Sequence, residues 1–417
     1  MKIYLDNCST TRVSSEAANA AFRAMTEVYA NPSAPHYAGQ EAERLVKRAR
    51  QKIAVSIGAK PGNIVFTSGA TESDNLALFS AFYSGHQNDS GEDKVTAKQG
   101  TLLVSAVEHP AVLAAADTLS ARGVKVERIP VFGPDTASPG MVNIADLREM
   151  LAEDVKLVSI LHVSNEIGTI QPVEEISRVI SMYNSDKSVR VRLHIDAAQS
   201  YGKIHIDAAN GDFQLVDFIS LSAHKLHGPK GTGALFAASP NKLHPVIFGG
   251  GQEGGIRSGT ENVPGIAGFA AAVHMAGLDI VGHAKHANAC RRRLLEGIVA
   301  EVPDIHINSP RDASITGKAG CCSPYILSVG FLGTRGEVLV HELEKSGIYV
   351  STGSACASRD TKNKGNDVLA AVGIPAGVIE GTLRFGISWE NNIDEMEFTV
   401  DRLKKAVERF RRVGRSN

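Results

Sequence analysis

The chain has 417 residues, of which 43% are hydrophobic, and its 44 basic side chains nearly balance its 45 acidic ones, leaving a formal net charge of −1. This length predicts a large core and two domains within one compact unit, and the charge balance argues against a polyanionic or membrane partner. Residues 1–12 contain no apolar stretch of the signal-peptide kind, and the most apolar long run, 269–281, is interrupted by His274 and Asp279. We therefore expect a cytoplasmic protein without a membrane span.

The sequence contains five cysteines, Cys8, Cys290, Cys321, Cys322 and Cys356, and no Cys-x-x-Cys pair. An odd number without that spacing fits neither a disulfide framework nor a thiolate metal site, and we expect no metal centre. At least one cysteine is therefore available for chemistry.

Residues 1–240 alternate short apolar runs with longer amphipathic segments. We predict strands at 3–6, 63–67, 102–106, 124–130, 157–163, 190–195, 215–221 and 234–237, and helices at 14–29, 40–57, 75–82, 111–122, 144–151 and 173–183. Strands separated by helices predict an α/β fold with a mostly parallel sheet covered on both faces. The polar segment 84–100 lacks periodicity and predicts an exposed loop or insertion.

The C-terminal part predicts a smaller α/β unit. Strands are expected at 323–330 and 381–387 and a helix at 336–346, while basic residues at helical spacing in 402–415 predict a solvated helix face. We predict a large domain at 16–263 and a small domain formed by 1–15 together with 264–417.

Four polar residues stand where predicted strands end: His109, Asn165, Asp196 and Lys225. Ligands bind outside the carboxyl ends of the strands in such sheets, so this shared position indicates one common site. Taken alone, His109 fits equally a helix-start residue that is hydrogen-bonded to backbone. The coincidence of four such residues favours the site.

Lys225 lies between the apolar run 215–221 and a glycine-rich turn. A lysine in a desolvated pocket has a lowered pKa and can attack a carbonyl, as a Schiff base with pyridoxal phosphate requires. Asp196 ends an earlier strand, where its carboxylate can keep a pyridine nitrogen protonated. An isolated lysine is more often a solvated loop residue, so the surroundings of Lys225 are what favour the cofactor.

The turn at 68–74 follows a predicted strand and precedes a predicted helix. Such a helix N-terminus favours a phosphate, because its first N–H groups and its dipole both attract an anion. The turn alone is weak evidence for a phosphate site, since Ser and Thr cap most helices without binding a ligand.

Nine strings, in order from residue 4 to residue 388, resemble one family. They are YLDNCSTT, TSGATESDN, EHPAV, NEIGTIQPV, HIDAAQSYGKI, SAHKLHGPKGTGAL, GGGQEGGIRSGTEN, STGSACAS and LRFGIS. They resemble the cysteine desulfurases, the NifS/IscS-like branch of the fold-type-I pyridoxal phosphate enzymes with a class V aminotransferase-type fold. The resemblance implies a large domain with a mostly parallel, seven-stranded sheet and a smaller C-terminal α/β domain.

The resemblance also implies residue roles around pyridoxal 5'-phosphate. Lys225 would carry the cofactor as a Schiff base, Asp196 would pair with the pyridine nitrogen, Gln199 would reach the ring oxygen, and His109 would stack on the ring and take part in proton transfer. The phosphate would be held by Ala70, Thr71, Ser222, His224 and, from the other subunit of a homodimer, Thr260. Asn165 and Arg384 match the positions that bind the substrate carboxylate, for which a guanidinium is a suitable bidentate donor.

Cys356 lies in a small, polar stretch, which we expect to be a mobile loop at about 351–366, as in the group I members of the family. A cysteine there is accessible, and its thiolate is nucleophilic. Cys290, Cys321 and Cys322 are interpreted as packing residues, and so is Cys8, which replaces the family's usual alanine. Ser164 likewise stands where the family commonly has asparagine.

The resulting hypothesis is conversion of L-cysteine to L-alanine, with the sulfur carried as a persulfide on Cys356. The acceptor would be a protein of iron–sulfur cluster assembly or of tRNA thiolation, without direct nucleic-acid binding. One alternative is another pyridoxal phosphate enzyme of this fold, such as a selenocysteine lyase or an aminotransferase, which would need no exposed cysteine. The other is a catalytically silent binding subunit, which the presence of Lys225, Asp196 and Cys356 argues against.

Overall fold

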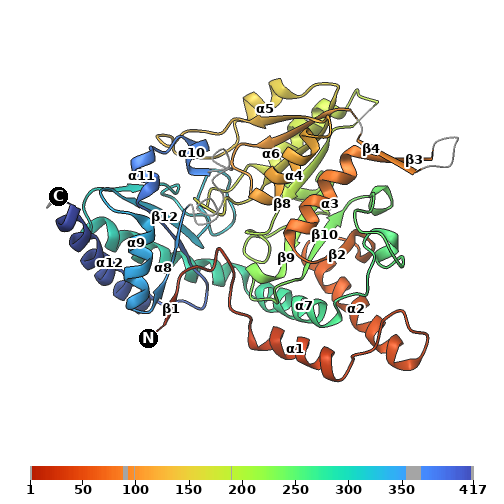
Figure 1. Ribbon diagram of the computed structural model, residues 1–417, viewed down its shortest axis with the longest axis horizontal. Coiled ribbons are helices and arrows are strands. Elements are labelled where there is room, and N and C mark those ends of the chain that lie inside the picture. The colour runs from red at the N-terminus through yellow and green to blue at the C-terminus, as the bar shows by residue number, and fades with distance from the viewer. Residues whose placement is uncertain (1, 88–92, 98, 189, 354–367, 415–417) are drawn as a thin grey trace.

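The computed structural model describes residues 2–87, 93–97, 99–188, 190–353 and 368–414 (Figure 1). Its centre is a seven-stranded sheet with the order β2-β10-β9-β8-β7-β5-β6. The strands are β2 (Ile64–Thr67), β10 (Gly233–Ala237), β9 (Phe218–Ser222), β8 (Arg192–Asp196), β7 (Val155–Leu161), β5 (Thr101–Ser105) and β6 (Lys125–Ile129). Only β10 runs antiparallel to its neighbours, β2 and β9, which confirms the predicted, mostly parallel seven-stranded sheet.

Helices cover both faces of this sheet. They are α1 (Ser15–Thr26), α2 (Tyr37–Ser56), α3 (Ala70–Phe82), α4 (Pro110–Ser120), α5 (Ile144–Met150), α6 (Val173–Asn184) and α7 (Val263–Gly277). Alternate strand residues enter two cores: Leu103 packs with residues of α1, α2, α6 and α7, whereas Leu102 and Val104 pack with residues of α3 and α4. Strands β5 and β7 are mostly apolar in sequence because both of their faces are buried, whereas the edge strand β6 is partly exposed and mostly polar.

A second sheet, β11-β12-β15-β14, lies to one side of the first (Figure 1). Its strands are β11 (Ile305–Ile307), β12 (Ile326–Phe331), β15 (Thr382–Gly386) and β14 (Ser351–Thr352), and all pair antiparallel. Around it lie α8 (Ile280–Glu301), α9 (Gly336–Lys345), α10 (Val368–Val372), α11 (Ala376–Glu380) and α12 (Ile393–Gly414). This is the expected smaller α/β unit.

The N-terminal strand β1 (Ile3–Tyr4) pairs in parallel with β13 (Ile348–Tyr349), so the chain begins beside its C-terminal part. The residues after β1 then reach the large unit, where Thr11 N donates a hydrogen bond to His224 O. The side chains of α7 belong to the core of the large sheet. The domain boundary at residue 263 stays a prediction.

Segment 84–100 was expected to be an exposed loop or an insertion. It contributes to an antiparallel pair of strands, β3 (Tyr83–Gln87) and β4 (Asp93–Ala97), which fits the second alternative. Backbone hydrogen bonds hold these two strands together, and their sequence shows no apolar periodicity from which the pairing could be predicted. Helix α3 begins at Ala70 rather than at residue 75, so Thr71 lies in its first turn. Five 3₁₀ turns complete the described elements: η1 (Pro61–Asn63), η2 (Gly211–Phe213), η3 (Ala223–Lys225), η4 (Pro240–Lys242) and η5 (Glu253–Gly255).

Within the described residues, no single helix has the length and apolar character needed to cross a membrane. The pair α7 and α8 meets that test together by length and composition only, with a bend of 76° between the two helices.

Candidate active site

The carboxyl ends of the large sheet's central strands open into a cavity of about 530 Å³. Parallel pairing aligns these ends, since Leu161 of β7 is opposite Asp196 of β8, and Asp196 is opposite Ser220 of β9. The cavity is lined by the predicted site residues Ala70, Thr71, His109, Asn165, Asp196, Gln199, Ser222, His224, Lys225 and Arg384. The tertiary structure therefore brings together side chains that are far apart in sequence.

Two predicted site residues are not among these. Thr260 is exposed and does not line the cavity of its own chain, so its contribution to a second subunit stays a prediction. Cys356 lies outside the described residues, and its role also stays a prediction.

Lys225 is the last residue of η3, directly after β9. Its Nζ donates to Cys8 O at 2.5 Å and to Ser9 O at 2.8 Å. Burial lowers the pKa of Lys225, and the positive charge of Arg384 lowers it further, while Asp196 opposes the shift. A lowered pKa increases the fraction of neutral amine, which is the nucleophilic form.

Asp196 ends β8 and is buried. Its Oδ1 accepts a hydrogen bond from Ala198 N at 2.8 Å. Burial raises the pKa of Asp196 to about 7, and the nearby carboxyl of Asp74 adds to the effect. A cationic ring nitrogen placed here would reverse that shift by supplying the missing opposite charge.

His109 is the N-cap of α4, where its Nδ1 accepts a hydrogen bond from Ala111 N at 3.1 Å. Burial lowers the pKa of His109 to about 4, with smaller contributions from the charges of Lys225 and Arg384. The ring is therefore neutral near pH 7, and its proton is on Nε2. The helix-start interpretation and the cavity interpretation of this residue are both correct.

The cavity contains buried polar atoms that fit a bound cofactor. Ser222 Oγ and Gln199 Oε1 have no hydrogen-bond partner among the described residues, although both atoms are sealed from solvent. An unmatched buried polar atom is costly, and a bound group that pairs with both would remove that cost. Gly69 provides no side-chain cap to α3, which leaves the first-turn N–H groups without such a partner. These features fit a phosphorylated, hydroxylated ring such as pyridoxal phosphate.

Arg384 reaches the cavity from β15 of the smaller sheet. Its Nη1 donates to Glu166 Oε1 at 2.7 Å and to Asn165 O at 3.1 Å. Its Nη2 donates to the hydroxyls of Ser9 and Ser351, both at 2.9 Å. This fixed fork presents a guanidinium to whatever enters between the two units.

The sequence analysis missed a set of acidic side chains at this site. Glu166 lines the cavity, and Asp74 and Glu108 are buried near Asp196. Burial raises the pKa of Glu108 well above its ordinary value, and burial raises that of Asp74 to about 7. A signal was available, since Glu166 follows Asn165 and Glu108 precedes His109 directly, but the directions of side chains in a turn cannot be read from the sequence.

Three of the cysteines interpreted as packing residues are confirmed as such. Cys8, Cys290 and Cys322 are buried, whereas Cys321 is half-buried. Cys8 Sγ lies 3.8 Å from Tyr325 O, and burial raises the pKa of the Cys8 thiol. A buried thiol with a raised pKa is unreactive.

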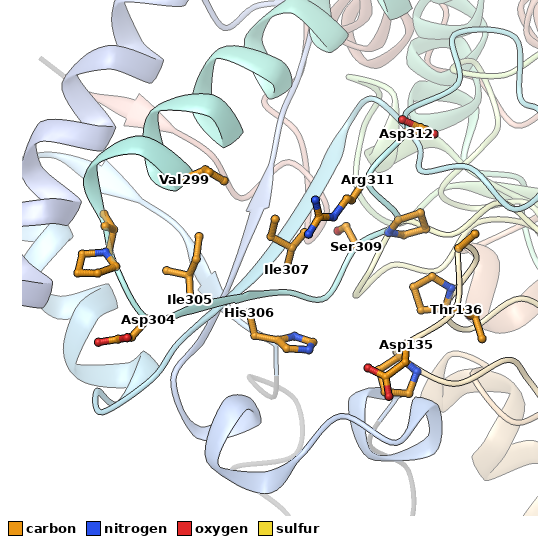
Figure 2. A pocket seen from close by; sticks show the side chains of 16 residues that line it. Asp135, Thr136, Val299, Asp304, Ile305, His306, Ile307, Ser309, Arg311 and Asp312 are labelled. Atoms are coloured by element: carbon orange, nitrogen blue, oxygen red, sulfur yellow. The ribbon is translucent and has the colours of Figure 1, made fainter.

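A larger cavity of about 880 Å³ lies elsewhere (Figure 2). It is bounded on one side by Asp135 and Thr136 and on the other by 304–307. None of the predicted site residues lines it, and the described residues include no group of His, Cys, Asp and Glu side chains that could hold a metal ion. Size alone therefore does not make it the active site.

Comparison with known proteins agrees with this geometry. The model of the aminotransferase class-V family matches residues 3–398. A curated relative named cysteine desulfurase IscS, from Dictyoglomus turgidum, is 34% identical over 99% of this chain and 96% of its own length. The chain belongs to the NifS/IscS-like cysteine desulfurase family.

Solved structures of similar proteins share the fold over nearly the whole chain. A NifS-like protein with 34% identity superimposes with a TM-score of 0.83, covering 98% of this chain and all of its own. A structure described as SspA in complex with cysteine has 30% identity and a TM-score of 0.72, covering 93% of this chain and 99% of its own. The α/β architecture described above is thus that of the desulfurase family.

Proposed function

We propose that the protein is a pyridoxal phosphate-dependent cysteine desulfurase that converts L-cysteine to L-alanine and transfers the sulfur through Cys356. The observation that carries the proposal is one cavity in which the amine of Lys225, the carboxyl of Asp196 and the guanidinium of Arg384 converge. Membership of the family supports it, as does the relative solved in complex with cysteine.

We propose that Lys225 bonds the cofactor and that Asp196 pairs with its ring nitrogen. Gln199 Oε1 and Ser222 Oγ would bond the ring oxygen and the phosphate, which would give both buried atoms a partner. Ala70, Thr71 and His224 would complete the phosphate site, and the flat, neutral ring of His109 would stack against the cofactor. When bound, the cofactor withdraws electrons from the α-carbon of the amino acid and so makes its proton removable.

The residues of the chain would then bind the substrate and move its protons. Arg384 would hold the α-carboxylate through its fork, and Asn165 Nδ2 would donate to the same group. Lys225 Nζ, with its lowered pKa, would take the α-proton and later return a proton. The neutral His109 can exchange a proton at Nε2 with the substrate thiol.

The sulfur would leave by attack of the Cys356 thiolate on the sulfur of the bound cysteine. The new S–S bond forms as the carbon–sulfur bond breaks, the electron pair returns to carbon, and protonation of that carbon gives alanine. Cys356 keeps the sulfur as a persulfide, and a thiol of the acceptor receives it. Either an iron–sulfur scaffold or a tRNA-thiolation protein fits this chemistry.

We further propose a homodimer. Phe22 and Met25 are exposed on α1, Tyr29 is exposed shortly after this helix ends, and Phe248 is exposed beside the glycine-rich segment that leads to Thr260. Large exposed side chains of this kind are commonly covered by a partner surface. Thr260 would then add to the phosphate site of the other subunit.

The test is to incubate the cofactor-loaded protein with L-cysteine and a thiol reductant and to quantify alanine and sulfide together. Equal amounts are expected, and Cys356→Ala should reduce both at least about 100-fold while the cofactor stays bound. Cys321→Ala is the matched control, with little expected loss. Wild-type rates of both products from Cys356→Ala would refute the role of Cys356, and activity on L-selenocysteine alone would favour a selenocysteine lyase.

A further inference from the structure

Glu166 is hydrogen-bonded to both side chains that are proposed to bind the substrate carboxylate, Arg384 and Asn165. Its Oε1 accepts from Arg384 Nη1 at 2.7 Å and from Asn165 Nδ2 at 2.8 Å. Both donors therefore converge on one carboxylate oxygen of the protein itself. Glu166 lines the same cavity as Lys225, so this oxygen lies where a bound amino acid would enter.

We propose that Glu166 is an internal stand-in for the substrate carboxylate, which holds Arg384 and Asn165 in the substrate-free protein and is displaced when an α-carboxylate binds. This inference rests on the proposed role of Arg384 and Asn165 as the substrate anchor. It adds a specificity-determining residue to that site. Displacement raises the threshold for binding, so that a ligand needs a carboxylate in the correct place to gain access to Arg384.

The charges around Arg384 support displacement over simple addition. Its guanidinium already has two carboxylates within ion-pair distance, Glu166 at 2.7 Å and Asp6 at 3.5 Å. A third carboxylate beside the same guanidinium would be repelled by the two that already lie there, and this repulsion is stronger where water screens charges poorly. Movement of Glu166 away from Arg384 removes the nearer of these two carboxylates.

The side chain of Glu166 can move while the backbone of the turn after β7 stays in place. Ser164 Oγ accepts from Glu166 N at 3.4 Å and from Ile167 N at 3.3 Å, and Gly168 N donates to Ser164 O at 2.9 Å. These contacts hold the turn after β7 by its main chain. Rotation about the side-chain bonds of Glu166 can therefore release Arg384 while Asn165 keeps its position.

The test compares L-alanine with L-alanine methyl ester, which differ only in the charged carboxylate. Their dissociation constants are measured by absorbance titration of the cofactor-loaded protein, so the readout is binding and not turnover. Glu166→Gln should bind L-alanine about tenfold more tightly than the wild type does, because a neutral amide competes less well for Arg384. Binding of the methyl ester should be unchanged.

Two further variants distinguish a specific role of Glu166 from a general effect of negative charge near Arg384. Asp6→Asn removes the other negative charge but not the shared contact with Asn165, and it should tighten L-alanine binding less than Glu166→Gln does. Should Glu166→Gln fold poorly, as judged by its Tm, Glu166→Asp keeps the charge but is too short for both contacts, and it should also bind L-alanine more tightly.

Equal or weaker L-alanine binding by Glu166→Gln, with normal folding, would overturn the stand-in role. An equal effect of Asp6→Asn would also overturn it, since general charge would then suffice. Arg384→Lys tests the underlying assignment: it should weaken L-alanine binding at least about tenfold. If it does not, the proposed anchor itself is wrong, and the stand-in role falls with it.

Discussion

His194 Nε2 lies 3.5 Å from Asp74 Oδ1 in a part of the large sheet that solvent does not reach. Burial lowers the pKa of His194 to about 4 and raises that of Asp74 to about 7, so the histidine is neutral. Its ring is fixed by Ser159 Oγ at 2.8 Å and Ser220 Oγ at 2.9 Å. Asp196, two residues along the same strand, thus has a second buried carboxyl close behind it.

This arrangement predicts that Asp74 and Asp196 contribute less to the stability of the cofactor-free protein as the pH rises from about 4 to about 7. The folded-state pKa values of Asp74 and Asp196, about 7, exceed the unfolded value, so the folded protein holds more protons within that window. Asp74→Asn removes one such group. The change in the free energy of unfolding from pH 5 to pH 7.5 should therefore be more favourable in this variant than in the wild type by at least about 1 kcal/mol. Urea unfolding at the two pH values measures this difference.

The exposed Asp117 of α4 supplies the control for replacing an aspartate by asparagine, because it lies at the surface and not in the core. An identical slope for Asp74→Asn and the wild type would show that Asp74 does not hold a proton in this range.

Ser222 allows a separate test of the cofactor site. Its buried Oγ has no partner among the described residues, so Ser222→Ala should leave the stability of the cofactor-free protein unchanged or slightly raised. The same change should weaken pyridoxal phosphate binding about tenfold, because a phosphate hydrogen bond is lost. Equilibrium dialysis measures the affinity, and thermal unfolding measures the stability.

Ser220→Ala is the matched comparison on the same strand. Its Oγ bonds His194, so this variant should lose about 1 kcal/mol of stability while its cofactor affinity changes little. Equal cofactor affinities for Ser222→Ala and the wild type would argue against Ser222 as a phosphate ligand.

Gly233 is packed against the turn that begins α3. A Cβ atom at this position would lie 2.6 Å from Gly69 Cα and 2.6 Å from Leu221 O, and neither backbone atom can move aside cheaply. Gly233→Ala should therefore cost roughly 1–3 kcal/mol of stability and, by displacing the turn, should weaken cofactor binding. Urea unfolding and a pyridoxal phosphate titration check the two effects.

A control is provided by Gly62, around which a Cβ would meet nothing within 4 Å. Gly62→Ala should be neutral in both measurements. If Gly233→Ala binds the cofactor as the wild type does, the close contact between the strand and the turn does not shape the phosphate site.

The sequence by itself determined the alternation of strands and helices and the residues that end the strands. These are local properties: a mostly apolar run marks β7, Asp196 ends β8, and His109 and Asn165 each follow the end of a strand by a few residues. Lys225 could be identified for the same reason, and parallel pairing made it reasonable to expect all four at one edge. The resemblance to a family added Arg384, which no local pattern connects to them.

Only the tertiary structure decided what these residues meet. The carbonyls of Cys8 and Ser9 reach Lys225 because β1 pairs with β13, and Glu166 meets Arg384 because the smaller sheet lies against the turn after β7. Such contacts join positions far apart in the chain, so no local pattern encodes them. The pKa values of Asp74 and Asp196 depend on the same long-range burial, because desolvation is a property of the folded surroundings and not of the residue.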